Sequence, residues 1–434
     1  MPEILNALVD VSEAFRRQDH DWFLPARAAR FDAVKRTGAI RWEKHQLRPG
    51  VDFRHGGLFL QRDPSSTFRG PYYGDETLPF AVSFPSPRTV RLRVSARGAL
   101  RDTRDSLMLT GLVPEDRSWK VKRTQGGAEY RGPHGAVTVS TDPWRVEVRD
   151  AAGKVLTGTR ALGDAMCFMN YDPTPFAFVR RGGDHQRHMA ASFTLASDEK
   201  IFGTGESFTR LDKRGQAVTL WAHDAQGVQN RRMYKPVPFF LSSAGYGMFV
   251  HATTPMTFDF GHTYDETNTI YLGDDELDLF IFLGDPKEVL TAYTALTGRP
   301  QVPPTWSFGL WMSRITYKSE AETRAVAQGL RRHRIPCDVI HLDTGWFEQD
   351  WRCDYRFAPS RFKNATTMLK DLKRDGFRIC LWQLPYFTHD NALYPELARK
   401  GLLVPHADGG AETQEAALDF SNPKTARWYQ DRLA

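Results

Sequence analysis

Between about residue 50 and residue 290, the chain alternates apolar and polar positions in short runs. TVRLRVSA, GAVTVST and WRVEVRD are typical, and clusters of Gly, Pro, Asn and Asp separate such runs. A period of two places successive side chains on opposite faces of a strand, so each run predicts a half-buried β-strand. Many short strands with frequent turns and little helical periodicity predict a β-sandwich over residues 51–290.

The segments that border this strand-rich region have other patterns. Residues 1–50 follow no single period, and we expect an N-terminal segment with a helix followed by a loop. At the far end, Asp285 is expected to cap a short helix that begins with Pro286 and stops at Gly298. The end of this helix and the prolines behind it make residues 291–305 a stiff connector, and we place a domain boundary there.

Residues 306–434 alternate predicted strands and predicted helices. We expect strands at 306–313, 337–343 and 377–385, helices at 319–336 and 364–376, and the start of another helix at 422–433. This alternation predicts parallel strand pairing. Apolar runs such as VIHL and ICLW suit a sheet that is buried on both faces. A (β/α)8 barrel and a doubly wound sheet both fit the pattern.

The ends of the predicted strands carry a carboxylate and several aromatic side chains. Asp343 ends the second strand and precedes Trp346, Trp382 lies at the end of the third, and Tyr317 follows the first. Parallel sheets bind ligands at the carboxyl ends of their strands. A carboxylate accepts hydrogen bonds from two vicinal hydroxyls, and an aromatic face stacks on the C–H face of a sugar ring. A capping Asp and a core Trp are the ordinary alternatives, but their joint occurrence favours a sugar site.

Composition and charge disfavour several classes of partner. The chain has 58 basic and 52 acidic residues, a net charge of +6 and no dense Lys/Arg stripe, so we expect no nucleic acid partner. It has no run of about 18 apolar residues and no signal-peptide pattern, so we expect no membrane partner. The cysteines form no C-x-x-C pair, and we expect free thiols in a reducing cytoplasm; they are Cys167, Cys337, Cys353 and Cys380.

Motifs for cofactors and metals are weak. GTGESF at 203–208 matches the dinucleotide fingerprint only in part, and no strand–helix–strand unit follows it. His341 and Asp343 face the same side of a strand, but a third metal ligand is missing. No G-x-S-x-G elbow is present. We therefore expect neither a metal nor an organic cofactor.

Several segments, taken in order, resemble glycoside hydrolase family 31, the α-glucosidases and α-xylosidases. They include FGTGESFTRLDKRG, HLDTGWF, GFRICLWQLPYF and LDFSNPKTARWY, and the resemblance covers roughly residues 200–434. HLDTGWF and LWQLPYF look most like the bacterial α-xylosidases. The resemblance implies a galactose-mutarotase-like β-sandwich followed by a (β/α)8 TIM barrel, of which residues 306–434 would supply the first three β/α units.

The resemblance also implies an activity and a set of site residues. The family cleaves α-linked sugars with retention at the anomeric carbon, without metal or cofactor, on oligosaccharide or α-glycoside substrates. Asp343 matches the aspartate that binds hydroxyls of the non-reducing-end sugar, and Trp382 matches a tryptophan of the same subsite. Thr344 and Trp346 match the segment beside the neighbouring subsite. Tyr317 falls near an aromatic site position. Family members often associate, which allows a homo-oligomer.

One departure from the family pattern concerns catalysis. The nucleophile motif expected after the fourth barrel strand and the later acid/base aspartate are both absent from the sequence. Such barrels need about 250 residues. Retaining hydrolysis needs two carboxyls about 5–5.5 Å apart. We therefore expect an incomplete barrel, a catalytic pair beyond residue 434, and a chain that is inactive alone.

Two alternatives to a hydrolase stay open. One is a carbohydrate-binding or interaction protein that keeps the sandwich and half a site. The other is a mutarotase-like activity in the sandwich, which needs a His and a carboxylate on one face. His251 and Asp259 are the candidates for that pair by residue type alone.

Overall fold

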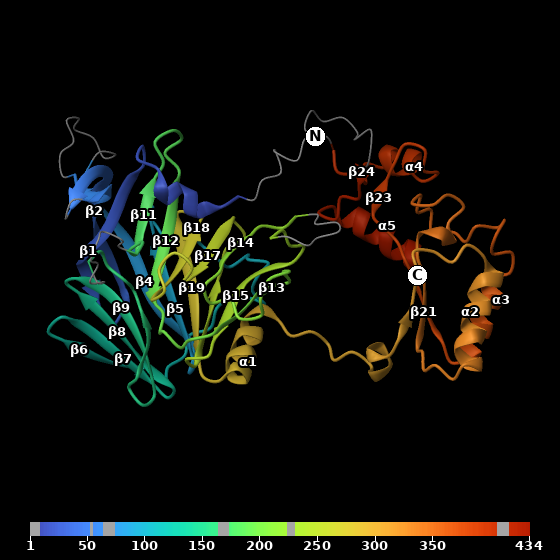
Figure 1. Cartoon of the computed structure of the whole chain (residues 1–434), viewed down its shortest axis with the longest axis horizontal. Helices are drawn as coiled ribbons and strands as arrows, with labels where there is room; N and C mark the ends of the chain where they lie inside the picture. Colours follow the sequence, from blue (N-terminus) through green and yellow to red (C-terminus); the bar gives the residue numbers. More distant parts are fainter. Residues whose placement is uncertain (1–8, 53–54, 64–73, 164–172, 224–230, 406–415) are drawn as a thin grey trace. The chain divides into compact units, whose positions relative to one another are not determined.

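The computed structural model divides the chain into two compact units, Met1–Arg299 and Pro300–Ala434. It describes residues 9–52, 55–63, 74–163, 173–223, 231–405 and 416–434. Figure 1 shows the first unit as layers of strands and the second as a small group of strands and helices. None of the helices in the described residues is long and apolar enough to cross a membrane.

The first unit is built on a fourteen-stranded sheet and a five-stranded sheet, and all of their strand pairs are antiparallel. The large sheet runs in the order β13-β15-β16-β19-β5-β4-β2-β1-β11-β12-β18-β17-β14, with β3 on β2, and the small sheet runs β10-β9-β8-β7-β6. The strands are β1 (Asp21–Asp32), β2 (Thr37–Asp52), β3 (His55–Arg62), β4 (Glu76–Ser86), β5 (Thr89–Ser95), β6 (Lys120–Thr124), β7 (Gly127–Gly132), β8 (Gly135–Thr141), β9 (Trp144–Asp150), β10 (Val155–Gly158), β11 (Ala177–Arg180), β12 (Arg187–Thr194), β13 (Ile201–Gly205), β14 (Ala217–Leu220), β15 (Pro236–Ser242), β16 (Tyr246–Val250), β17 (Met256–Phe260), β18 (Thr267–Leu272) and β19 (Glu276–Leu283).

One apolar core lies between the two sheets of the first unit. Along β5, Val90, Leu92 and Val94 belong to it, and they alternate with Arg91 and Arg93. The small sheet contributes alternate residues to the same cluster, such as those of β8 and β9. Figure 1 shows β6 to β9 as a layer beside the large sheet. The predicted β-sandwich is therefore confirmed, and the period of two is its physical basis.

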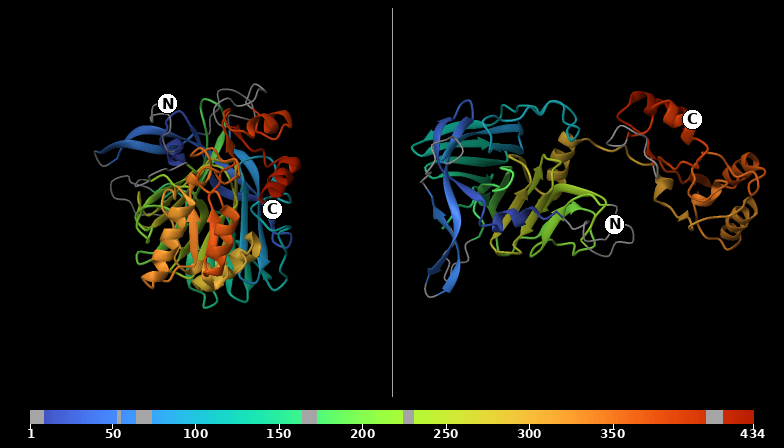
Figure 2. Two further views of the ribbon diagram at one scale, coloured as in Figure 1. Left: turned by 90° about the vertical axis from the view of Figure 1, so that its right-hand side faces the viewer. Right: turned by 90° about the horizontal axis from the view of Figure 1, so that it is seen from above.

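The loop expected after an N-terminal helix is wrong. Residues 21–52 form the long strands β1 and β2 in the middle of the large sheet, the long blue strands of Figure 2. Their pairing register shifts between Pro25 and Arg27 and again between Ala28 and Arg30. Each shift moves the following side chains to the other face, so no single period survives in the sequence. The only helix described before β1 is a short 3-10 helix, Val11–Arg16.

Helix α1 (Pro286–Thr297) follows the sandwich and packs on it. Asp285 and Glu288 form the capping box, and Gly298 ends the helix with a φ of 105°. Val289 and Leu296 are buried against phenylalanines of β15, β16 and β19. The first unit ends at Arg299, within the connector predicted for residues 291–305.

The second unit contains a parallel three-stranded sheet in the order β20-β21-β22. Its elements are β20 (Trp311–Met312), α2 (Glu320–Arg332), β21 (Val339–Leu342), α3 (Ala365–Arg374), β22 (Arg378–Leu381), β23 (Tyr386–Phe387), α4 (Tyr394–Arg399), β24 (Ala416–Ala417) and α5 (Pro423–Leu433), and β23 pairs antiparallel with β24. Helices α2 and α3 bury Leu330, Met368 and Leu372 in the same apolar cluster as Ile340 of β21. The predicted alternation and parallel pairing are confirmed.

The first strand of this unit is shorter than predicted. Residues Thr305–Phe308 form a 3-10 helix, and only Trp311–Met312 pair as a strand. The backbone N–H of Ser307 donates to Pro304, and that of Gly309 donates to Trp306. These donors are used within local turns, so they are not available to a sheet.

Candidate functional site

Two predicted site residues meet at the carboxyl end of the parallel sheet. Asp343 directly follows β21, and Trp382 directly follows β22. Leu342 and Leu381 are paired in register, and the backbone N–H of Trp382 donates to the Leu342 carbonyl at 2.8 Å. The sheet therefore places the carboxylate and the indole on adjacent strand ends, where parallel sheets bind ligands.

The Asp343 side chain is half-buried and only partly engaged. One carboxylate oxygen accepts the backbone N–H of Thr344 at 2.8 Å and so caps the 3-10 helix Thr344–Trp346. Among the described residues, the other oxygen has no hydrogen bond or ion pair. Asp343 is thus both the turn residue that the ordinary interpretation predicts and a carboxylate with acceptor capacity left for a ligand.

A pair of indole rings lies at the neighbouring strand end. The ring of Trp382 is half-buried and meets Trp351 edge to face, with ring centroids 5.4 Å apart. Trp351 is 57% exposed and has a φ of 66°, a left-handed backbone that presents its ring at the surface. We did not predict Trp351 from the sequence, although the aromatic run behind Asp343 contains it.

The other three predicted site residues are buried. Trp346 packs against Phe347 and Phe357, and its Nε1 donates to the Trp382 carbonyl at 2.8 Å. The hydroxyl of Thr344 lies 3.4 Å from Asp350. Through Trp346, the two strand ends are joined to the core below them.

Tyr317 lies in the same apolar cluster. Its hydroxyl has no partner among the described residues, and the Arg314 guanidinium lies 5.5 Å from the ring centroid. Burial raises the pKa of Tyr317 above its ordinary value, although Arg314 acts in the opposite direction. A direct contact of Tyr317, Thr344 or Trp346 with a ligand stays a prediction.

His341, which was suggested as a metal ligand together with Asp343, contacts a hydroxyl group. The Nδ1 of His341 lies 2.8 Å from the Ser313 hydroxyl. In the part of the chain that the structure describes, no group of three or more His, Cys, Asp or Glu side chains is arranged to hold a metal ion.

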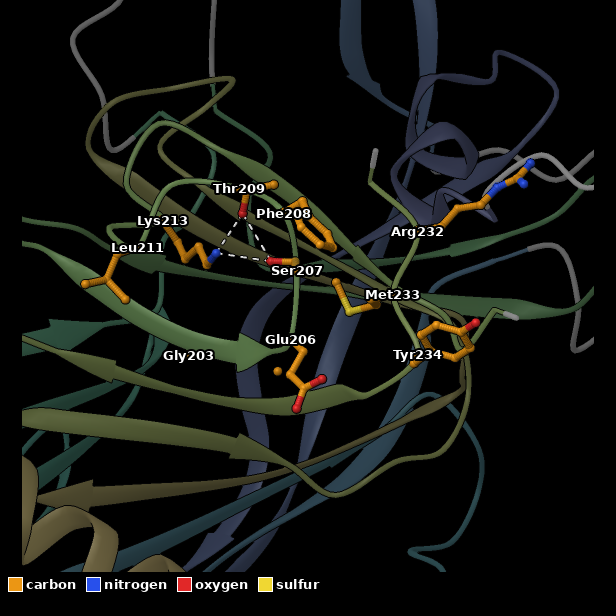
Figure 3. Close-up of a pocket in the computed structure, with 11 residues that line it drawn as sticks. Gly203, Glu206, Ser207, Phe208, Thr209, Leu211, Lys213, Arg232, Met233 and Tyr234 are labelled. Carbon is orange, nitrogen blue, oxygen red and sulfur yellow. Dashed lines mark hydrogen bonds between the residues drawn. The ribbon is translucent and has the colours of Figure 1, made fainter. Parts of the chain in front are cut away.

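The GTGESF stretch borders a cavity of about 550 Å³ in the first unit (Figure 3). Gly203 and Gly205 have φ values of 124° and 92°, and a Cβ on Gly205 would lie 2.0 Å from the Lys235 carbonyl oxygen. Turns rather than a helix follow, so this stretch is not a dinucleotide fingerprint. Its glycines serve a tight turn at the end of β13.

A buried lysine organises this cavity. Figure 3 shows the Nζ of Lys213 directed at Ser207 and Thr209, at 3.2 and 2.6 Å. Burial lowers the pKa of Lys213 below its ordinary value. The ring of Phe208, 71% exposed, stands on the same loop. The cavity therefore combines an exposed ring with hydroxyl groups held in place by a lysine.

The histidine and carboxylate suggested for a mutarotase-like activity do not meet. The side chain of Asp259 accepts hydrogen bonds from Thr263 and from the backbone of His262. His251 instead lies 2.7 Å from Asp278. The pairing of His251 with Asp259 is therefore wrong.

Solved structures share this fold. A cycloalternan-forming enzyme from Listeria monocytogenes, solved with a pentasaccharide substrate, matches at a TM-score of 0.74 and 18% identity over 95% of this chain and 38% of its own. A Flavobacterium johnsoniae GH31 dextranase complexed with glucose matches at a TM-score of 0.70 and 23% identity over 94% of this chain and 46% of its own. At these identities, the similarity shows the fold alone.

Curated relatives are more similar in sequence. The α-xylosidase XylQ of Lactiplantibacillus pentosus is 34% identical over 255 residues, 57% of this chain and 33% of its own. An α-xylosidase of Emericella nidulans is 31% identical over 58% of this chain and 33% of its own. Alpha-glucosidase 2 of Bacillus thermoamyloliquefaciens is 28% identical over 74% of this chain and 40% of its own. The chain thus spans about a third to two-fifths of the length of these relatives.

Two family profiles match the two units. The Glycosyl hydrolase 31 N-terminal galactose mutarotase-like domain matches residues 79–259, and the Glycosyl hydrolases family 31 TIM-barrel domain matches residues 300–434. Together they account for more than half of the chain. The chain therefore belongs to glycoside hydrolase family 31, and it combines that family's mutarotase-like N-terminal domain with sequence of its TIM-barrel domain.

Proposed function

We propose that this chain is the N-terminal part of a retaining α-glycoside hydrolase of the α-xylosidase/α-glucosidase type, which removes terminal α-linked sugars. The observation that carries the proposal is the strand-end group of Asp343, Trp382 and Trp351. A half-free carboxylate beside two indole rings suits a sugar, which offers hydroxyls at its edge and C–H groups on its face. The α-xylosidases among the relatives favour α-xylosides as the first substrates to test.

Each predicted residue has a part in this proposal. The uncapped oxygen of Asp343 accepts hydroxyls of the non-reducing-end sugar, and Trp382 lines the same subsite with Trp351 at its edge. Trp346 ties the two strand ends together, Thr344 contacts Asp350 in the following loop, and Tyr317 packs in the core beneath them. We propose that these three buried residues line the substrate site and also help to fix the position of Asp343.

We further propose that these 434 residues bind sugar without cleaving it. A retaining mechanism needs two carboxyls about 5–5.5 Å apart, one as nucleophile and one as acid and then base. Among the described strand ends, Asp343 is the only carboxylate that directly follows a strand of the parallel sheet. The nucleophile and acid/base motifs are absent from the sequence. The three strands β20 to β22 would then be the first three of eight, with the catalytic pair in a segment beyond residue 434.

Binding and cleavage are tested separately. Ligand-observed NMR of the 434-residue chain with methyl α-xyloside and methyl α-glucoside should show binding that Asp343→Asn removes and Asp354→Asn retains. The same chain should release no nitrophenol from 4-nitrophenyl α-xyloside or α-glucoside above the rate in buffer. Release at enzymatic rates would overturn the proposal of an inactive chain. Binding unaffected by Asp343→Asn would overturn the proposed site.

A non-catalytic carbohydrate-binding protein is the second candidate. The lone strand-end carboxylate favours it, because a binding protein needs no second carboxyl. The mass of the native product in its source cells separates the two functions. A product much heavier than 49.4 kDa supports the hydrolase, and one near 49.4 kDa supports the binding protein.

We also propose a cellular location for the protein, the cytoplasm. Three cysteines are free thiols, Cys337, Cys353 and Cys380, and burial raises the pKa of the last two. Free thiols suit a cytoplasmic protein. Association into a homo-oligomer stays a prediction, which sedimentation of the purified chain would test.

A further inference from the structure

A serine, a histidine and an aspartate form a hydrogen-bonded chain in the first unit. The Ser106 Oγ lies 2.6 Å from the Nε2 of His251, and the Nδ1 of His251 lies 2.7 Å from the Oδ2 of Asp278. Ser106 belongs to the loop between β5 and β6, His251 directly follows β16, and Asp278 lies on β19. Because the three residues are far apart in the sequence, no motif reveals them.

The sheet fixes the aspartate and the histidine. Leu277 and Leu279 of β19 enter the core, so Asp278 faces the opposite side of the sheet. There Arg91 holds its two oxygens at 2.7 and 2.6 Å. The backbone N–H of His251 also donates to the Asp278 carbonyl at 2.8 Å. The imidazole is thus attached to Asp278 through both backbone and side chain.

These contacts determine which imidazole nitrogen carries the proton. Burial alone would raise the pKa of Asp278, but hydrogen bonds from Arg91 and His251 hold it below its ordinary value. An ionised carboxylate only accepts hydrogen bonds, so Nδ1 of His251 is the protonated nitrogen. In the neutral imidazole, Nε2 is then the unprotonated nitrogen and can accept a hydrogen bond from the Ser106 hydroxyl. This is the arrangement of an activated serine: a nucleophile, a base and a group that orients the base.

The serine and the histidine line a cavity of about 530 Å³. Met108, Ala252, Thr253 and Thr254 border both this cavity and an apolar one of about 240 Å³. The apolar cavity is further lined by Trp221, Pro236, Pro238 and Met256, among others. A substrate with a polar reacting group and an apolar portion fits this combination.

The buried carboxylates of the polar cavity are not free to act as bases. Arg101 pairs with Asp274, Arg93 pairs with Glu276, and Arg91 pairs with Asp278. A sugar-isomerising site would need an unpaired carboxylate at the histidine, and the carboxylate that contacts His251 is the one paired with Arg91. Here the imidazole instead accepts from a hydroxyl, which favours nucleophilic chemistry.

One backbone group beside the serine is available to a developing oxyanion. The N–H of Met108 is already engaged with the Ser106 Oγ at 3.2 Å. The N–H of Leu107, next to the serine, makes no hydrogen bond within the described residues. Backbone donors beside a nucleophile stabilise the oxyanion of a tetrahedral intermediate.

We propose that Ser106, His251 and Asp278 form a second hydrolytic site, specific for carboxylic esters with an apolar acyl or aryl group. Ser106 Oγ bonds to the ester carbonyl carbon while its proton passes to Nε2 of His251. The carbon–oxygen bond to the alcohol breaks, and Nε2 returns the proton to the leaving oxygen. Nε2 of His251 then takes a proton from water, and the water oxygen bonds to the acyl carbon. The bond from that carbon to Oγ breaks, Nε2 returns the proton to Oγ, and the carboxylic acid leaves. No cofactor or oxidant takes part, and the site is independent of the glycosidase proposal.

The first test is hydrolysis of 4-nitrophenyl butyrate by the full 434-residue chain. Ser106→Ala and His251→Gln should each lower kcat/KM by about 100-fold or more. Ser118→Ala is the matched control, because Ser118 lies in the same loop and bonds Asp116 instead of a histidine. It should retain the full rate. Equal rates in Ser106→Ala and the unsubstituted chain would overturn the proposal.

A second measurement uses the unsubstituted chain, so it does not depend on the folding of a variant. An organophosphonate probe reacts covalently with activated serines, and peptide mass spectrometry locates the modified residue. We expect modification at Ser106, blocked by prior addition of 4-nitrophenyl butyrate. Modification spread over several serines, or none at Ser106, would refute an activated nucleophile.

Discussion

Single side chains decide what the strand ends can bind. Trp351 presents an exposed ring beside Trp382, and its backbone has a left-handed conformation. The residue types at the strand ends were predictable from the sequence, since a carboxylate after a buried strand points to a ligand site. Trp351 was not predictable, because a positive φ at a tryptophan has no sequence signature.

Trp351→Ala should weaken sugar binding about two- to tenfold, since one stacking face is lost. Trp306→Ala is the control. Trp306 stacks under Arg378 at the start of β22, the opposite end of the strand from the predicted site. Titration of methyl α-xyloside by NMR measures both. An equal loss in the two variants would mean that Trp351 has no specific contact with the sugar.

The buried ion pair of Arg91 and Asp278 tests the energetics of the sandwich. Asp278→Ala leaves the guanidinium of Arg91 buried without its partner, and we expect a loss of about 3–5 kcal/mol in the free energy of unfolding. Asp102→Ala removes the partner of Arg104 on the surface and should cost too little to resolve. Urea unfolding followed by tryptophan fluorescence compares them. Similar midpoints for the two variants would contradict the prediction.

The same pair predicts a dependence on pH. Because the folded pKa of Asp278 lies below its ordinary value, its stabilising contribution is complete above about pH 4. It is lost as the pH falls through the lower folded pKa. Unfolding free energies measured from pH 6 downward should therefore decline more steeply in the unsubstituted chain than in Asp278→Ala. Parallel profiles would mean that Asp278 contributes no pH dependence.

At the scale of elements, periodicity and capping predict regular segments well. The alternation of β5 and the capping box of α1 are both visible in the sequence. Elements with local irregularities were mispredicted. The register shifts in β1 break the period of two, and the turns around Ser307 use donors that a longer β20 would need. Such features depend on tertiary pairing, so a window of sequence does not contain them.

Helix caps give a quantitative test at this scale. Asp285 accepts the backbone N–H groups of Lys287 and Glu288, so Asp285→Ala should cost about 1 kcal/mol of stability. Asn364 occupies the same position at α3 but makes no side-chain cap hydrogen bond, so Asn364→Ala should change stability little. Thermal unfolding measures both variants. A larger loss from Asn364→Ala would show that cap geometry does not govern these helix ends.

For the whole molecule, the sequence predicted two units of different class, and their boundary falls near the proline-rich connector. Pairing partners far apart in the chain, such as β5 with β19, were beyond prediction. The same holds for the contact of Ser106 with His251, because both depend on how strands meet in the large sheet.

The two proposed sites lie on different units, so a fragment separates them. Residues 1–299 contain the complete core between the two sheets and the Ser106–His251–Asp278 group, and they lack Asp343. We expect this fragment to fold with a cooperative thermal transition, because its strands and apolar cluster belong to one compact unit. It should hydrolyse 4-nitrophenyl butyrate at the rate of the full chain and show no binding of methyl α-xyloside. Ester hydrolysis that disappears in a folded fragment would place the esterase activity outside the sandwich, and sugar binding that persists would remove Asp343 from the proposed subsite.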